Sequence, residues 1–296
     1  MAAKHQRRSL RGKGPTPRAE DRVYHKAYKA KQEALRRQAN RPRSKPSRTP
    51  VGADWVVGRN PVLEALQAGL PVKQAYVAEG AERDDRLRDI LKFAAEHSLP
   101  LLQVTRAELD RVTGGLVHQG VALQLPAYDY ADADDVFEAA LEIPERGLVV
   151  ALDGVTDPRN LGAIIRSAAA FGAQGVVIPA RRSASMTAAA WKTSAGAAAR
   201  IPVAKVTNLN QLLRRASGAG FTVVGLAGEG KTPLSGLPGA DGPLLLVVGS
   251  EGDGLARLVR EHCDALVSIP IASQVESLNA SVAAAVALYE ITQQRA

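Results

Sequence analysis

The sequence has a single cysteine, Cys263, among its 296 residues. One cysteine cannot form an internal disulfide, and such sparing use is typical of a reducing compartment, so we expect a cytoplasmic protein. There is no C-x-x-C pair and no histidine-rich cluster, so we expect no metal site. No apolar run approaches the roughly 18 residues of a membrane helix. The basic N-terminus is not followed by the apolar region of a secretory signal, so we expect no membrane association.

The net charge of +8 is distributed unevenly. Residues 1–50 hold 16 Lys and Arg against 3 Asp and Glu, which leaves 22 against 27 for the other 246 residues. These first 50 residues lack aliphatic periodicity, so we predict a disordered basic arm that ends in a proline-rich linker. A solvated arm that aids solubility is one interpretation. Contact with RNA is the other, and Tyr24 and Tyr28 favour it because they can stack on bases.

Residues 53–128 alternate between short apolar strands and amphipathic helices, which predicts a small α/β domain. Its size suits a substrate-binding adaptor. His118 lies in a loop just before its last strand, where a structural role is favoured over a catalytic one, although contact with RNA stays open.

Residues 147–296 alternate similarly but with longer, more apolar strands, at about 148–152, 175–178, 222–226, 244–248 and 266–270. This pattern predicts a parallel sheet covered by helices on both faces. The acidic stretch 129–146 is expected to form a linker and a short helix.

Three polar turns in the larger domain each follow an apolar strand and precede a helix. The first contains Asn160, which stands where a helix N-cap belongs. Arg166 lies six residues later on an otherwise apolar helix. It suits either a surface arginine or one directed at a phosphate.

The second turn contains Gly249, Glu251, Gly252 and Gly254. It matches neither the dinucleotide fingerprint G-x-G-x-x-G nor a P-loop. Glycines alone can serve the geometry of a strand-to-helix turn, but they also let the backbone approach a flat ligand closely. The turn geometry does not require a carboxylate, so Glu251 points to a further role.

The third turn contains Ser277, Leu278 and Asn279 and precedes the last helix. Ser277 could cap that helix and Asn279 could satisfy its free N–H groups. One face of the helix is aliphatic, with Val282, Val286 and Tyr289 at helical spacing. Three such turns at the carboxyl ends of parallel strands predict a ligand site at one edge of the sheet.

Taken together and in this order, the three turns resemble the motifs of the SpoU (TrmH-type) RNA 2′-O-ribose methyltransferases of the SPOUT class. The first turn fits D-P-x-N-x-G-x3-R, the second fits G-x-E-G-x-G, and the third fits I-P-(x)n-S-L-N-x-S-V-A from Ile269 onwards. The stretches G-R-N-P-V-x-E-A-L (58–66) and H-Q-G-V-A (118–122) are similar to the substrate-binding domain of the subgroup that methylates a guanosine of 23S rRNA.

The resemblance implies a deep trefoil knot in the C-terminal sheet, an exception to the usual unknotted topology. It also implies a homodimer and S-adenosylmethionine held mainly by backbone at Gly249, Ile269 and Leu278. The family usually has Met-x-Gly after Ile-Pro, whereas this chain has Ser273 in place of that glycine, which would narrow the cofactor loop.

The resemblance assigns the catalytic roles to Asn160, Arg166, Glu251, Ser277 and Asn279. Arginine is effectively always protonated, so we expect Arg166 to bind an RNA phosphate and stabilise alkoxide charge rather than act as a base. The other four are expected to orient substrate and cofactor.

Three alternatives remain open from the sequence. The RNA could be a tRNA. The chain could be an assembly factor that binds RNA without catalysis, or an ordinary nucleotide-cofactor enzyme, which the missing fingerprint disfavours.

Overall fold

The computed structural model describes residues 54–82, 84–272 and 277–296. The predicted basic arm and Ser273 lie outside these ranges. Within them, no helix has both the length and the hydrophobicity of a membrane span.

The small domain is built on a four-stranded sheet with the strand order β1-β4-β2-β3. Its elements are β1 (Trp55–Val57), α2 (Arg59–Gln67), β2 (Gln74–Ala78), α3 (Asp85–Glu96), β3 (Leu101–Val104), α4 (Arg106–Val112) and β4 (Val121–Gln124). Strand β2 pairs in parallel with β3 and antiparallel with β4, so the sheet is mixed. Its core is aliphatic and separate from those of the large domain.

Helix α3 illustrates how the sequence sets these elements. Leu87, Ile90 and Ala94 recur at helical spacing, and all three are buried. Asp84 begins the helix because its Oδ1 accepts a hydrogen bond of 2.8 Å from the Leu87 N–H. That backbone bond and the guanidinium of Arg59 lower the pKa of the Asp84 carboxyl.

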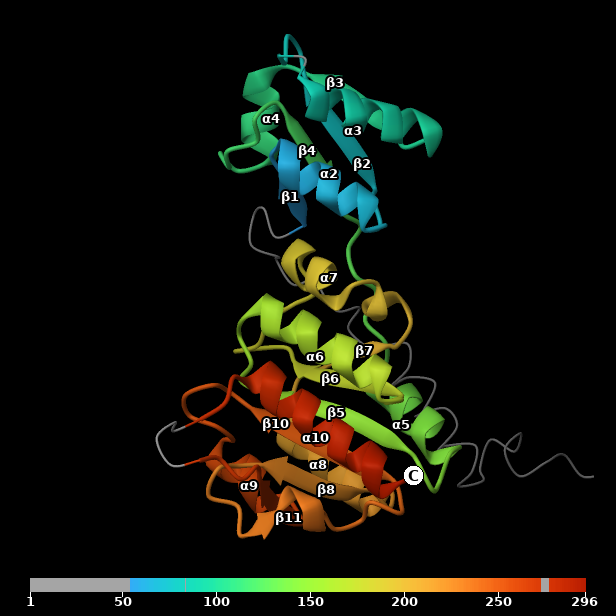
Figure 1. Ribbon diagram of the computed structural model, residues 1–296, viewed down its shortest axis with the longest axis vertical. Helices are drawn as coiled ribbons and strands as arrows, with labels where there is room; N and C mark the ends of the chain where they lie inside the picture. Colours follow the sequence, from blue (N-terminus) through green and yellow to red (C-terminus); the bar gives the residue numbers. More distant parts are fainter. Residues whose placement is uncertain (1–53, 83, 273–276) are drawn as a thin grey trace, which may run out of the picture. The chain divides into compact units, whose positions relative to one another are not determined.

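The large domain contains a seven-stranded sheet with the order β7-β6-β5-β10-β8-β11-β9 (Figure 1). Its strands are β5 (Leu148–Asp153), β6 (Gly175–Pro179), β7 (Val203–Val206), β8 (Thr222–Leu226), β9 (Thr232–Pro233), β10 (Leu244–Gly249) and β11 (Ala265–Ser268). Its helices are α5 (Ala133–Leu141), α6 (Pro158–Ala170), α7 (Ala188–Ser194), α8 (Leu209–Gly218), α9 (Arg257–Glu261) and α10 (Ala280–Gln294), with short 3₁₀ turns at Ala197–Ala199 and Leu234–Gly236. All the strand pairs of this sheet are parallel, which confirms the predicted fold class.

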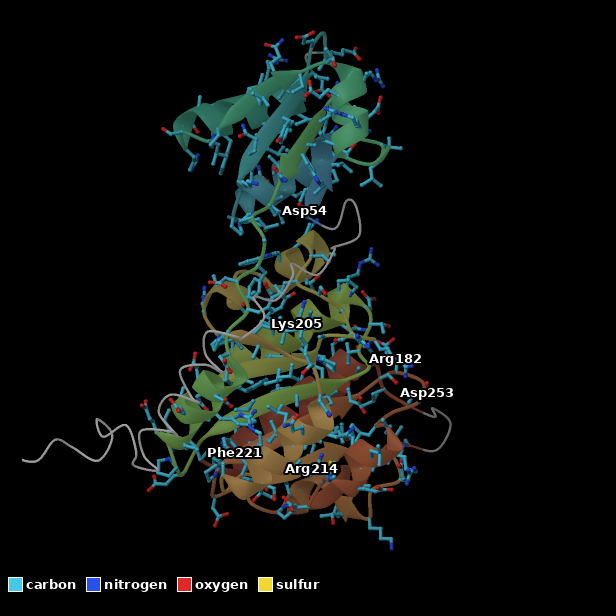
Figure 2. All side chains as sticks on the ribbon, turned by 180° about the vertical axis from the view of Figure 1, so that it is seen from behind. Asp54, Arg182, Lys205, Arg214, Phe221 and Asp253 are labelled. Carbon is cyan, nitrogen blue, oxygen red and sulfur yellow. The ribbon has the colours of Figure 1, made fainter. Side chains whose placement is uncertain are left out.

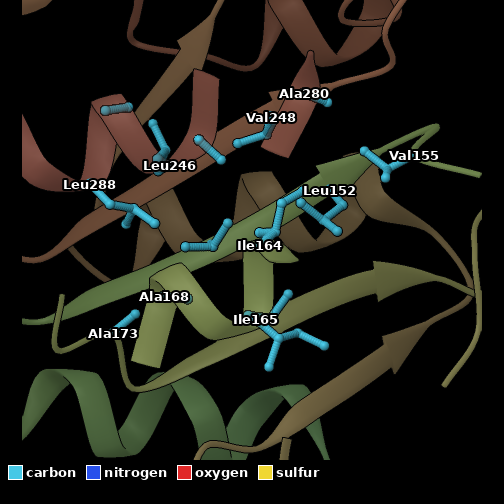
Figure 3. Close-up of a cluster of buried hydrophobic side chains, with 14 of the residues drawn as sticks. Leu152, Val155, Ile164, Ile165, Ala168, Ala173, Leu246, Val248, Ala280 and Leu288 are labelled. Atoms are coloured by element: carbon cyan, nitrogen blue, oxygen red, sulfur yellow. The ribbon is translucent and has the colours of Figure 1, made fainter. Parts of the chain in front are cut away.

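Helices cover both faces of this sheet, as the apolar strands require. The six residues of β10 are all buried. Leu246 and Val248 pack toward α6 and α10, whereas Leu245 and Val247 pack toward α5 and α8. Figure 3 shows the first of these cores, where Leu152, Ile164 and Leu288 from three separate segments meet.

Two strands and one helix were not anticipated. Strand β9 has two residues and β7 is a short strand near the other end of the sheet order, so neither produces a strong alternating pattern. Helix α7 has seven residues, of which the first three are alanines, so it gives no clear apolar periodicity.

The last helix packs through a different face from the aliphatic one that its sequence suggests. Val282, Val286 and Tyr289 are exposed, at 49, 38 and 52%. The buried face consists of Ala280, Ala284, Ala287, Leu288 and Ile291. Apolar residues surround this helix, so periodicity alone cannot select the packed face, and small alanines let α10 approach α6 closely.

Cys263 lies partly buried just before β11. Its Sγ is 3.3 Å from the carbonyl oxygen of Val259. Burial, with a smaller contribution from the Asp264 carboxylate, raises the pKa of the thiol to about 12. The thiol is therefore uncharged at neutral pH and belongs to the packing of the domain.

Candidate functional site

A pocket of about 260 Å³ lies at the carboxyl edge of the large sheet. Three segments line it, and they follow β8, β10 and β11 in the chain. The predicted cofactor residues Gly249, Ile269 and Leu278 all belong to its lining. Strands β5 and β10 are neighbours here although the chain forms β6, β7, β8 and β9 between them, so the pocket lies beside a switch point of the sheet.

The glycine-containing turn is held in one conformation by its own backbone. Ser250 and Gly254 exchange two backbone hydrogen bonds, of 3.0 and 3.2 Å. A Cβ on Gly249 would lie 2.6 Å from the Leu255 nitrogen and would also meet the carbonyl group of Gly254. Asp153 at the end of β5 fixes the far side of the turn, because its Oδ2 accepts a bond of 2.7 Å from the Ala256 N–H. Gly249 is therefore required by the turn itself.

Asn160, Glu251 and Asn279 form a hydrogen-bond network across three segments of the chain. The amides of Asn160 and Asn279 both donate to Oε1 of Glu251, the latter over 2.8 Å. Asn279 Nδ2 also lies 3.2 Å from Asn160 Oδ1. Both bonds to the carboxylate use Oε1, so Oε2 has no partner among the described residues.

Asn160 is not the N-cap of its helix, as its sequence position suggested. Helix α6 begins earlier, and Asp157 caps it by accepting a hydrogen bond of 2.8 Å from the Arg159 N–H. Asn160 is thereby placed inside the first turn, where its side chain is 9% exposed and is free to reach Glu251. The true cap lies three residues upstream, just before Pro158, which suits the first helical position.

Asn279, rather than Ser277, caps α10. Its Oδ1 accepts from the N–H of Ser281 at 2.9 Å and from the Ser281 hydroxyl at 2.6 Å. These donors fix the orientation of the amide and direct its Nδ2 toward Glu251. Ser277 is exposed and lines the pocket. Asn279 therefore couples the start of the last helix to the network.

Arg166 is the one predicted site residue that stands apart from this assembly. It is exposed on α6 and does not line the pocket. Among the residues that the structure describes, its guanidinium has no hydrogen bond or ion pair. This exposed position fits both roles left open by the sequence, a surface arginine and an arginine directed at a phosphate.

The pocket is lined by three acidic residues, and one of them, Glu229, was not predicted from the sequence. Glu229 pairs with Arg260, whose Nε also donates to the Leu255 carbonyl over 2.8 Å. Glu251 and Asp253 add two carboxylates to the lining. Glu229 lies just after β8, and residues that follow a parallel strand are expected at the ligand-binding edge of the sheet. This position was the signal in the sequence that could have identified it.

A second, polar depression of about 490 Å³ lies within the small domain. Arg59 lines it, with its guanidinium 2.6 Å from Asp84 and 3.2 Å from the Gln119 carbonyl. Arg86 and Arg106 also line it. The carboxylates of Glu79, Glu82 and Asp84 line it as well, so it is a candidate surface for polar groups.

His118 beside this depression is 3% exposed and serves the turn. Its Nδ1 accepts a hydrogen bond of 3.0 Å from the Gly120 N–H, which leaves Nε2 to donate to Asp110 over 2.9 Å. Both nitrogens are thus engaged, in agreement with the structural role that the sequence favoured. Contact with RNA is not available to this ring. In the described part of the chain, no cluster of three or more potential metal ligands occurs.

Comparisons with known proteins place this geometry in a family context. Residues 147–289 match the profile described as "SpoU rRNA Methylase family", and residues 55–131 match "RNA 2'-O ribose methyltransferase substrate binding". A protein of Mycobacterium avium (strain 104) named "Uncharacterized tRNA/rRNA methyltransferase" is 55% identical over 289 residues, covering 98% of this chain and 90% of that protein. One of the same name from Mycobacterium tuberculosis (strain ATCC 25177 / H37Ra) is 54% identical, covering 98% and 87%.

Two solved structures are similar in fold and moderately similar in sequence. The SpoU methyltransferase AviRb from Streptomyces viridochromogenes, in complex with the cofactor AdoMet, has a TM-score of 0.59 and 28% identity over 84% of this chain and 92% of that one. A putative RNA methyltransferase of the TrmH family from Porphyromonas gingivalis has a TM-score of 0.54 and 26% identity, over 82% and 90%.

Proposed function

The chain belongs to the SpoU rRNA methylase family, and from this membership we propose that it methylates a ribose 2′-hydroxyl of RNA with S-adenosylmethionine as methyl donor. The observation that supports this function best is the network of Asn160, Glu251 and Asn279 beside the glycine-bounded pocket. Residues far apart in the sequence converge there with their polar groups held at one point.

The pocket suits S-adenosylmethionine in shape and charge. Leu226, Val248 and Ile269 give it apolar walls for a flat base, and the tight turn after β10 brings backbone to its surface. Glu251 and Asp253 favour a positively charged ligand. When bound, the cofactor supplies a methyl group on a cationic sulfur.

The network would orient the ribose for an in-line attack. Two amides immobilise the Glu251 carboxylate through Oε1, and Oε2 stays available to accept a hydrogen bond from the ribose hydroxyl. Ser277, in the pocket wall, would add a hydroxyl donor. Holding the two reacting groups in line contributes much of the rate in such a transfer.

Arg166 would supply the positive charge. An arginine side chain is effectively always protonated, so Arg166 would bind an RNA phosphate and stabilise developing charge on the attacking oxygen. Its exposed position with no described partner keeps the guanidinium free for this purpose.

The proposed target is a guanosine of 23S rRNA. The match to a substrate-binding profile supports an RNA role for the small domain, and its arginine-lined depression provides a polar surface for recognition. An rRNA substrate also implies a cytoplasmic location.

Transfer of labelled methyl from S-adenosylmethionine to purified 23S rRNA tests this activity. A 2′-O-methyl group blocks alkaline cleavage of the following phosphodiester, so the label should appear in alkali-resistant dinucleotides. Label in tRNA alone would reassign the substrate. Cofactor binding without any transfer would support a silent assembly factor, and binding can be measured separately by calorimetry.

We also propose a homodimer formed through the exposed face of α10. Val282, Val286 and Tyr289 lie together on that face, and the Tyr289 ring contacts Phe171 with centroids 6.2 Å apart. Apolar surface of this kind is typical of an interface. Arg166 lies on the neighbouring helix α6, so the catalytic residues of two subunits would meet near this interface.

Val286→Glu should therefore convert the dimer to a monomer and abolish methyl transfer while the fold survives. A charge buried at an apolar interface has no partner there and opposes association. Light scattering gives the mass. Leu258→Glu on α9, where Leu258 is 46% exposed, is the matched control and should stay dimeric. A monomeric wild type, or a dimeric Val286→Glu variant, contradicts the proposed interface.

The trefoil knot remains a prediction, because the threading of the last segment depends on residues 273–276, outside the described ranges.

Removal of residues 1–50 should weaken RNA binding mostly at low salt. The segment carries 16 Lys and Arg against 3 Asp and Glu, so it should act by counterion release. The slope of log affinity against log salt should flatten by about 0.7 to 0.9 for each RNA phosphate that the arm neutralises in the full-length protein.

The methylated nucleotide should not change in this truncated protein, since phosphate contacts position a protein without reading sequence. Cofactor affinity is the internal control and should be unaltered. An unchanged salt slope would show that the arm makes no contribution, and a new methylation position would show that it reads sequence.

A further inference from the structure

The loop between β6 and α7 carries two arginines that the rest of the described chain does not neutralise. Arg181 and Arg182 are exposed, and their side chains have no hydrogen bond or ion pair among the described residues. Other arginines do pair with carboxylates: Arg59, Arg88, Arg111, Arg215, Arg257 and Arg260. Arg181 and Arg182 therefore place two positive charges side by side with no carboxylate partner among the described residues.

This loop is nevertheless fixed at both ends. The Ala180 N–H donates to the Val206 carbonyl over 2.8 Å, and the Ala184 N–H donates to the Val155 carbonyl over 2.8 Å. The Met186 N–H donates to the Tyr130 hydroxyl over 2.9 Å. Ala184 and Met186 are buried. Arg181 and Arg182 therefore lie in a short loop whose two ends are held by hydrogen bonds.

Arg182 itself has a left-handed backbone, with φ at +54°. Glycine adopts that conformation far more readily than a residue with a long side chain. A non-glycine residue held there is a reason to look for a role of its side chain.

This loop lies next to the proposed catalytic network. Its partner Val155 follows β5 and precedes the helix that carries Asn160. Next to Val155, a Cβ on Gly154 would lie 3.5 Å from the Cβ of Ser250, the neighbour of Glu251. Figure 2 shows Arg182 and Asp253 at the same edge of the large domain.

We propose that Arg181 and Arg182 form a phosphodiester-binding element that holds the RNA strand beside the nucleotide being methylated. This inference rests on the proposed function for the identity of the polyanion. The carboxylates of Glu251 and Asp253 repel an RNA backbone, so nearby cations are needed where the strand enters. A guanidinium also binds a phosphate through two parallel hydrogen bonds, which fixes orientation as well as charge. The two arginines are positioning residues and do not touch the reacting atoms.

The test uses the full-length variant Arg181→Ala/Arg182→Gly, in which glycine suits the left-handed backbone. Binding of a fluorescein-labelled single-stranded RNA oligonucleotide is measured over a range of KCl concentrations, and methyl transfer is measured on 23S rRNA. We expect Kd and KM for RNA to rise about tenfold, and the salt slope to flatten by about 1.4, because two phosphates are no longer neutralised. The kcat and the cofactor Kd should not change.

Two comparison proteins separate charge from structure. Arg214→Ala removes an exposed arginine of α8 that also has no described ion pair, away from this edge, and should match the wild type (Figure 2). Arg181→Lys/Arg182→Lys keeps both charges and should retain the wild-type salt slope.

The proposal is overturned if the Ala/Gly variant shows the RNA Kd and salt slope of the wild type, or if it changes only kcat or cofactor affinity. A wild type that transfers no methyl to any RNA refutes the proposed function instead. The oligonucleotide salt slopes still decide the role of the two arginines in that case.

Discussion

Arg166→Ala should lower kcat/KM for methyl transfer by about 10²- to 10³-fold, the effect typical of removing one donor that stabilises transition-state charge. No other residue between Asn160 and Arg181 carries a charge, so nothing nearby on that stretch can substitute for it. The guanidinium is exposed, has no described partner and does not line the pocket. The free energy of unfolding and the cofactor Kd should therefore stay close to wild type.

The matched control is Arg200→Ala, which removes another exposed arginine without a described ion pair. Its turnover should equal that of the wild type. Near-normal turnover in Arg166→Ala would remove this residue from the mechanism. A weaker cofactor affinity in the same variant would instead show that its effect is structural.

Gly249→Val should abolish cofactor binding and also destabilise the protein, by about 4 kcal/mol or more. The motif alone suggests a simpler effect, in which the new side chain blocks the ligand. In the structure the Cβ collides first with backbone at Gly254 and Leu255, so the whole turn must move. Calorimetry and thermal unfolding should both report the change.

Ala283→Leu tests whether the cofactor binds in the pocket without disturbing the glycine-containing turn. Ala283 lines the pocket from within α10, and leucine is a good helix former, so this variant should fold normally while its side chain occupies part of the roughly 260 Å³. We expect the cofactor Kd to rise at least about tenfold, the effect of roughly 1.4 kcal/mol. Ala139→Leu, on the exposed side of α5, is the control. An unchanged Kd in Ala283→Leu would place the cofactor elsewhere.

The sequence was informative wherever a property is local. The apolar strands β5, β6, β8 and β10 alternate with helices, and this is enough to predict a parallel sheet with a ligand site at its carboxyl edge. The three polar turns could be found for the same reason, since each one directly follows a strand.

Side-chain partners across the sheet could not be predicted in this way. Asn160 and Glu251 are 91 positions apart, and Asn160 and Asn279 are 119 apart, so no periodic pattern relates them. Local rules even suggested a competing role, because an asparagine near a helix start is usually its cap. Asp157 takes that role and releases Asn160 for the site.

The face through which the last helix packs could not be predicted from hydrophobic periodicity either. Helix α10 is apolar on several sides, so Ala284 and Leu288 are as plausible a packing face as Val282 and Val286. The choice is made by α6, against which the alanine face fits. Its consequence is an exposed aliphatic face next to the helix that bears Arg166.

The most direct test of the proposed activity is a map of 2′-O-methyl groups on the rRNA of a strain that lacks the gene. We predict that one guanosine of 23S rRNA loses its 2′-O-methyl group in the deletion strain, that the wild-type gene restores it, and that the Arg166→Ala gene does not. An rRNA methylation map identical to that of the parent strain would contradict the proposed activity, as would a change confined to tRNA.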